Sequence, residues 1–109
     1  MARTVLRDPR FDPEFLMLPE RVRESCWHVI AALRRRPQSP GAGFRVERLR
    51  GLAPIEAWTA HFENDRYRLV YVLDGESLIL FGVGLRPGFY RRLDRIRGGR
   101  PRRAGDLPT

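Results

Sequence analysis

The sequence of 109 residues contains no lysine and a single cysteine, Cys26. One cysteine excludes an internal disulfide framework and every zinc site built from several cysteines. The absence of lysine removes a common base, nucleophile and Schiff-base former, so proton transfer must use a histidine, a carboxylate, a tyrosine or the one thiol. The longest uncharged stretch of the second half, residues 77–85, is too short to span a bilayer. The first residues show no apolar run of a signal peptide, and we expect a cytoplasmic protein.

Positive charge is therefore carried by arginine alone. The chain has 21 basic and 13 acidic residues, for a formal net charge of +8. Residues 78–109 hold eight of the arginines and only two aspartates. Guanidinium groups stay protonated and bind phosphate oxygens in a bidentate manner. This segment favours a polyanionic partner, most simply a nucleic acid, although charge alone does not distinguish it from an anionic membrane surface.

The length and the ordinary apolar content predict one domain with one core. Hydrophobic spacing predicts a short strand at residues 3–7 and two helices, at residues 11–18 and 20–36, with Pro19 as the hinge between them. Residues 98–109 are rich in glycine, proline and arginine, and we expect a flexible tail there. The folded domain is expected to cover residues 1–97.

Aromatic and β-branched residues predict strands at residues 57–62, 67–73 and 77–85, after a possible strand at residues 44–49. Asn64-Asp65 and Asp74-Gly75 are expected to form two-residue turns between them. This register pairs Trp58 with Tyr71, and Leu69 with Leu80, on the side of the sheet that the helices are expected to cover.

The opposite side of the sheet gathers polar groups at one end. There the predicted register places His61 directly across from Arg68. It also pairs Arg68 with Phe81, about 17 Å from Arg86 along a straight strand. The two guanidinium groups would converge only if the chain bends, for which the glycines at 82, 84 and 88 give opportunity.

Several motifs occur together in a fixed order. They are the proline-hinged helical pair, the segment Arg48-Leu49-Arg50-Gly51, the strand Tyr67-Arg68-Leu69-Val70-Tyr71, and Arg86 followed by Tyr90. Over residues 3–93 the chain resembles the RelE/ParE superfamily, the toxins of bacterial toxin–antitoxin pairs. The resemblance implies an α+β fold in which two N-terminal helices pack on one face of a small antiparallel sheet.

The RelE branch is favoured because Arg68, Arg86 and Tyr90 are all present. The resemblance implies cleavage of mRNA in the ribosomal A site, without metal or cofactor, by attack of a 2′-hydroxyl on the adjacent phosphate. It assigns Arg68 to the scissile phosphate, Arg86 to the developing charge and Tyr90 to the attacking or leaving oxygen. His61 stands where relatives often carry a lysine or histidine, and it is either a proton-transfer group or a partly exposed structural histidine beside an arginine. The arginines expected to hold RNA are Arg45, Arg48, Arg50, Arg66, Arg91 and Arg92.

The resemblance also implies a cognate antitoxin as partner, besides mRNA and the ribosome, with the oligomeric state set mainly by the antitoxin complex. Two other functions stay open. One is a ParE-like inhibitor of DNA gyrase without nuclease activity, and the other is a non-catalytic member that binds RNA or a partner through the same face. Leu85, where many relatives carry a polar residue, and the missing lysines keep the second of these open.

Overall fold

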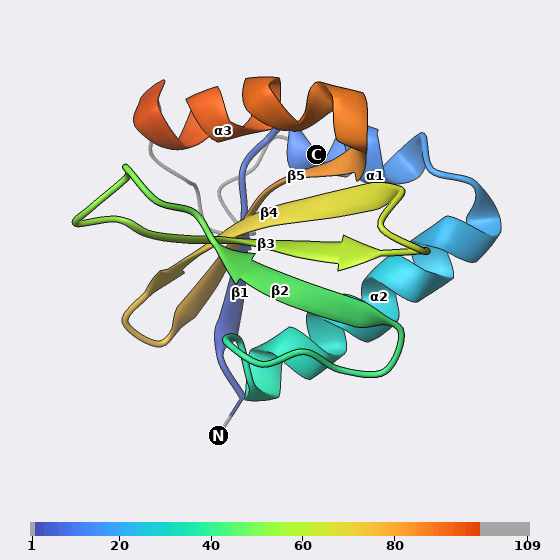
Figure 1. Ribbon diagram of the computed structural model, residues 1–109, viewed down its shortest axis with the longest axis horizontal. Coiled ribbons are helices and arrows are strands. Elements are labelled where there is room, and N and C mark those ends of the chain that lie inside the picture. The colour runs from blue at the N-terminus through green and yellow to red at the C-terminus, as the bar shows by residue number, and fades with distance from the viewer. Residues whose placement is uncertain (1, 99–109) are drawn as a thin grey trace.

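The computed structural model describes residues 2–98 and has an α+β fold built on one five-stranded sheet (Figure 1). The strand order is β1-β5-β4-β3-β2. β1 runs parallel to β5, and the other three pairs are antiparallel. The strands are β1 (Thr4–Arg7), β2 (Phe44–Arg48), β3 (Glu56–Phe62), β4 (Tyr67–Asp74) and β5 (Ser77–Leu85). The predicted fold class is confirmed.

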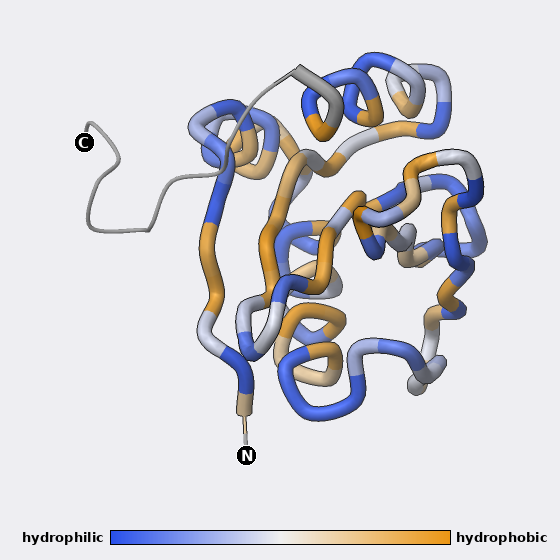
Figure 2. The backbone as a smooth tube through the Cα atoms, turned by 90° about the vertical axis from the view of Figure 1, so that its left-hand side faces the viewer, coloured by the Kyte–Doolittle hydropathy of each residue, from blue (hydrophilic) through white to orange (hydrophobic). Residues whose placement is uncertain are grey.

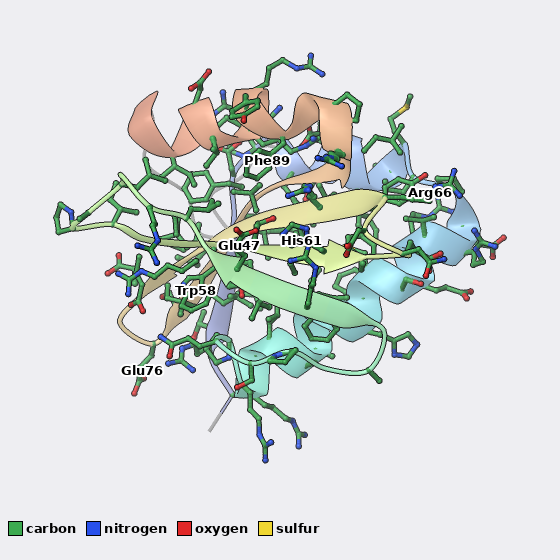
Figure 3. All side chains as sticks on the ribbon, viewed as in Figure 1. Glu47, Trp58, His61, Arg66, Glu76 and Phe89 are labelled. Atoms are coloured by element: carbon green, nitrogen blue, oxygen red, sulfur yellow. The ribbon has the colours of Figure 1, made fainter. Side chains whose placement is uncertain are left out.

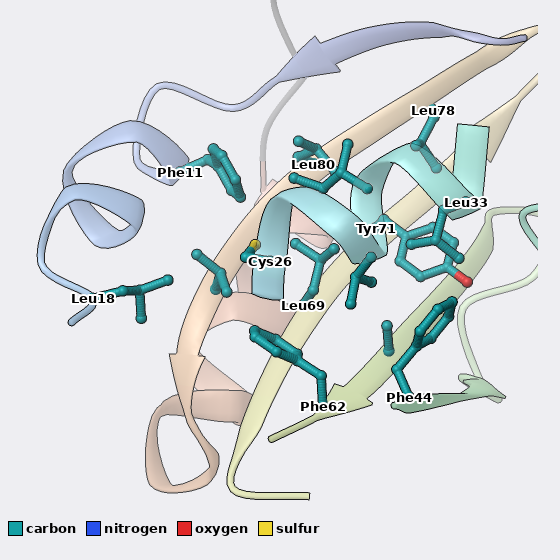
Figure 4. Packing of buried hydrophobic residues seen from close by; sticks show 14 of the residues in the cluster. Phe11, Leu18, Cys26, Leu33, Phe44, Phe62, Leu69, Tyr71, Leu78 and Leu80 are labelled. Carbon is teal, nitrogen blue, oxygen red and sulfur yellow. The ribbon is translucent and has the colours of Figure 1, made fainter. Parts of the chain in front are cut away.

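Helices α1 (Phe11–Leu16) and α2 (Glu20–Arg35) cover one face of the sheet. Pro19 lies between the two helices and has an extended backbone, in agreement with the hinge predicted at this residue. Aliphatic and aromatic residues of both helices and of the sheet meet in the main core, among them Phe11, Cys26, Leu33, Phe62, Leu69, Tyr71 and Leu80 (Figure 4). The buried Tyr71 hydroxyl donates a hydrogen bond to the carbonyl of Pro37 at 2.6 Å, so the largest core side chain has its polar atom satisfied. Within residues 2–98, no helix is long and apolar enough to cross a membrane.

The predicted register is confirmed for one hairpin and wrong for the other. β3 and β4 pair as expected, with Trp58 opposite Tyr71. In the β4–β5 hairpin Asp74 pairs with Ser77, because Gly75 (φ 58°) takes the first central position of the turn rather than the second.

A bulge between Val70 and Tyr71 shifts the β4–β5 register once more. Leu69 therefore pairs with Val83 rather than Leu80, and Arg68 pairs with Gly84 rather than Phe81. This correction places Arg68 two residues from the level of Arg86. The bend that the predicted register demanded is not needed.

The second face of the sheet is covered by α3 (Phe89–Gly98), which follows the single 3₁₀ turn η1 (Arg86–Gly88). A smaller core fills the space beneath it, formed by Leu52, Ala57, Val70, Val72, Ile79, Phe81 and Ile96. Figure 2 shows hydrophobic residues along the strands, and hydrophobic and hydrophilic residues alternating along the helices. The sequence predicts no helix of this length here, and α3 reaches Gly98, the first residue of the expected tail. The rest of the expected tail, residues 99–109, lies outside the described residues.

One carboxylate joins α1 to α3. Glu14 of α1 accepts hydrogen bonds from the backbone N–H of Val83 at 3.1 Å and from both terminal nitrogens of Arg95, at 2.8 and 2.9 Å. Arg92 Nε lies 3.3 Å from the same carboxylate. Arg92 is 6% exposed, so the expectation that it holds RNA is wrong: its guanidinium pairs with Glu14 and donates to the carbonyl of Leu85.

Glycines in β5 make room for this buried arginine. A β-carbon at position 82 would come within 2.8 Å of the Arg92 side chain, and one at position 84 would collide with its guanidinium group. The side chain of Arg92 therefore lies where β5 has no side chains of its own.

We predict that Glu14→Gln lowers the free energy of unfolding by about 3 kcal/mol, because it leaves two largely buried guanidinium groups without their counter-charge. Urea denaturation of the purified protein measures the change. Glu24→Gln, at an exposed position of α2, is the matched control. Equal stability of the two variants would contradict the role of Glu14 in holding α3.

Candidate functional site

Arg68, Arg86 and Tyr90 line one pocket of about 410 Å³, together with Pro87 and Phe89. The β4–β5 register brings Arg68 near the end of β5, and the N–H of Arg86 donates to the carbonyl of Arg66 at 3.2 Å. Pro87 is the second residue of the η1 turn, which leads the chain into α3 and places Tyr90 at the pocket. Three residues separated by up to 22 positions are thus brought together at the polar end of the sheet.

The guanidinium group of Arg68 lies over the ring of Phe89, 5.3 Å from its centroid. Burial lowers the pKa of Arg68, and the positive charge of Arg86 lowers it further. Arginine nevertheless stays protonated at physiological pH. The nearby acids Glu63 and Asp65 form ion pairs with Arg21 and Arg45 instead. The pocket therefore concentrates positive charge, which favours binding of an anion.

His61 lies beneath Arg68 and is 1% exposed. Arg68 Nη1 lies 3.4 Å from His61 Nε2 across the β3–β4 pair, and it can donate a hydrogen bond there when Nε2 carries no proton. Burial lowers the pKa of His61, and the charges of Arg68 and Arg45 lower it further, while Glu47 and Asp65 oppose this shift. The ring is therefore neutral near pH 7, and it is fully covered rather than partly exposed.

Glu47 on β2 is a site residue that the sequence analysis missed. Its Oε1 lies 3.2 Å from His61 Nε2, and more than half of its side chain is exposed (Figure 3). The sequence feature that could have indicated Glu47 is the alternation of side chains between the two faces along β2. This alternation puts Glu47 and Arg45 on the same side of the sheet as His61. No register between β2 and β3 was derived from the sequence, so the pairing could not be used.

The other arginines that were expected to hold RNA lie around the pocket and the sheet edge. Arg45 is bound to Asp65 at 3.3 Å on the exposed edge. Arg48, Arg50, Arg66 and Arg91 are exposed. Tyr90 is 76% exposed and stacks edge-to-face on Phe89. In the described part of the chain, no group of three or more His, Cys, Asp or Glu side chains is arranged to hold a metal ion.

We predict that protonation of His61 destabilises the fold. Because the folded pKa of His61 is lowered from 6.5, the unfolded chain binds the proton more readily, and stability falls as the pH falls below about 6.5. His61→Gln should remove this part of the pH dependence, which denaturation curves between about pH 7 and pH 5 would measure. His28→Gln, at an exposed position of α2, is the control. Identical pH dependence of wild type and His61→Gln would show that the buried ring has no such effect.

Two solved structures resemble this chain closely. E. coli toxin RelE, as a double arginine-to-alanine mutant in the free state, superposes with a TM-score of 0.68 at 23% identity, over 88% of this chain and 99% of that chain. The archaeal RelE–RelB complex from Pyrococcus horikoshii gives a TM-score of 0.66 at 18% identity, over 79% of this chain and 97% of that chain. Neither models of known families nor curated proteins match the sequence. The chain has the fold of the RelE-like toxins.

Proposed function

We propose that this protein is the toxin of a toxin–antitoxin pair and cleaves mRNA on the ribosome. The observation that carries the proposal is the pocket in which Arg68, Arg86 and Tyr90 meet. Two guanidinium groups suit the non-bridging oxygens of one phosphate, which they can bind through several N–H donors. The RelE-like fold supports the toxin assignment.

The reaction needs no group that this chain lacks. The 2′-oxygen bonds to the neighbouring phosphorus, the bond from phosphorus to the 5′-oxygen breaks, and a cyclic phosphate and a 5′-hydroxyl result. Arg68 and Arg86 stabilise the charge that develops on the phosphoryl oxygens. Tyr90 stands at the mouth of the pocket, where its hydroxyl can protonate or orient a departing oxygen.

The proton of the 2′-hydroxyl goes to Glu47, whose Oε1 lies 3.2 Å from His61 Nε2. Glu47 is the member of the pair that substrate can reach, because its side chain is exposed while His61 is covered. A positioned carboxylate can serve as the general base of such a step. No lysine is required for this step.

A protein antitoxin is the proposed partner that silences the toxin. The archaeal RelE in the matched structure is in complex with RelB. A partner that covers the exposed arginines around the pocket would block access of RNA and neutralise a chain of net charge +8.

We predict that Arg68→Ala and Arg86→Ala each lower the rate of mRNA cleavage by about 10²–10³-fold, because each removes a preorganised charge from the phosphate. The measurement is mapping of transcript ends after induced expression, on translated and untranslated copies of one message. Arg35→Ala, at the far end of α2, is the control for lost surface charge.

Each alternative has its own outcome in this experiment. Equal toxicity of wild type and both pocket variants would reject the site. Cleavage of the untranslated copy would reject the requirement for the ribosome. Growth arrest with a DNA damage response and intact transcripts would favour the gyrase inhibitor, and absence of toxicity would favour a non-catalytic binding protein.

We further predict that Tyr90→Phe slows cleavage more than it weakens binding. The ring and its stacking on Phe89 remain, and only the hydroxyl is lost. Cleavage rates and the affinity for a 2′-O-methyl RNA, which lacks the attacking hydroxyl, measure the two effects. An unchanged cleavage rate would remove Tyr90 from the chemistry.

A further inference from the structure

One nitrogen of His61, Nε2, lies within hydrogen-bonding distance of two groups. One of them can bond to it only when Nε2 is unprotonated, and the other only when Nε2 carries a proton. Arg68 Nη1, at 3.4 Å from Nε2, can only donate, so this bond requires a lone pair on Nε2. Glu47 Oε1, at 3.2 Å from the same nitrogen, accepts when ionised, so a hydrogen bond to it requires a proton on Nε2. A neutral imidazole can satisfy only one of these partners at a time.

The other ring nitrogen does not settle the choice. Nδ1 of His61 is buried and has no hydrogen-bond partner within residues 2–98. In many sites the partner of the second nitrogen fixes which tautomer is present. Here Nδ1 has no partner in either tautomer within residues 2–98, so Glu47 and Arg68 determine which of the two tautomers is favoured.

Charges of both signs surround the ring. From β2, His61 faces the positive Arg45 and the negative Glu47. From β4 it faces Arg68, and Asp65 in the β3–β4 turn adds a second negative charge. Two charges of each sign therefore act on one covered, neutral ring, and both groups within reach of Nε2 are charged.

We propose that His61 is a positioning residue that exchanges its Nε2 between Arg68 and Glu47. With the proton on Nδ1 the ring accepts from Arg68 and holds the guanidinium group over β3. With the proton on Nε2 the ring donates to Glu47 and leaves Arg68 to an incoming phosphate. The exchange moves one proton from Nδ1 to Nε2 without changing the net charge, and water carries it when the site opens locally.

Anion binding is then linked to the tautomer. A phosphate that draws Arg68 away removes the donor from Nε2 and so favours the Nε2–H form. By thermodynamic linkage, the Nε2–H form strengthens phosphate binding by the same factor. The identification of this phosphate as part of RNA rests on the proposed function. The exchange between the two partners does not.

The test observes the His61 ring nitrogens by long-range ¹H–¹⁵N NMR correlation, which distinguishes a protonated from an unprotonated nitrogen. The chain has only two histidines, and His28→Gln assigns the signals. Glu47→Ala should place the proton on Nδ1, and Arg68→Leu should place it on Nε2. The same tautomer in both variants would overturn the proposal. Amide spectra establish that each variant is folded, and Arg68→Met replaces Arg68→Leu if that variant is not.

A 2′-O-methyl RNA oligonucleotide, added to the wild type, separates this proposal from the proposed function. A shift of the ring toward the Nε2–H form supports both. Opposite tautomers in the two variants without any response to RNA support the exchange and count against RNA as the ligand.

Cleavage supplies the readout that a merely structural histidine would not move. His61→Gln keeps a donor for Glu47, so cleavage should be slower but keep the pH profile of the wild type. Loss of one limb of that profile would make His61 the proton-transfer group and overturn its positioning role.

Discussion

The pairing of β4 with β5 is the constraint on which the proposed site depends. A turn that begins with Gly75 and a bulge opposite Val70 and Tyr71 place Arg68 opposite Gly84. This register lets a side chain of the central strand share a pocket with Arg86 and Tyr90 without a bend in the chain. Bulges next to functional sites often serve to redirect a side chain in this way.

Both faces of the sheet are covered, and the candidate site occupies the gap that remains. α1 and α2 bury the aromatic face, and α3 buries the aliphatic part of the other face. The carboxylate of Glu14 holds α3 in place through Arg92 and Arg95. What stays open is the pocket lined by Arg68, Arg86 and Tyr90, and His61 lies covered beneath Arg68. The same helix that completes the core thus forms one wall of the pocket.

Local signals were enough to predict much of this arrangement from the sequence. The helical periodicity, Pro19 and the aromatic strands predicted the two helices, the central strands and the covered face of the sheet, and the cross-strand contact of His61 with Arg68 followed from one correct turn. The register of β5 could not be derived, because a bulge leaves no mark in a continuous apolar run and Asp-Gly fits two turn positions. The burial of Arg92 was equally hidden, since it depends on Glu14, 78 residues away. From charge alone, the buried Arg92 could not be distinguished from its exposed neighbour Arg91.

The central claim is that Arg68 and Arg86 act on one and the same phosphate. A double-mutant cycle tests it most directly, from the cleavage rates of a translated reporter mRNA by wild type, Arg68→Ala, Arg86→Ala and the combined variant. Residues that act as a unit are strongly non-additive, so the combined loss should be much smaller than the product of the two single losses. Losses that multiply would mean that the two guanidinium groups act independently, and the shared pocket would then not be the site of the chemistry.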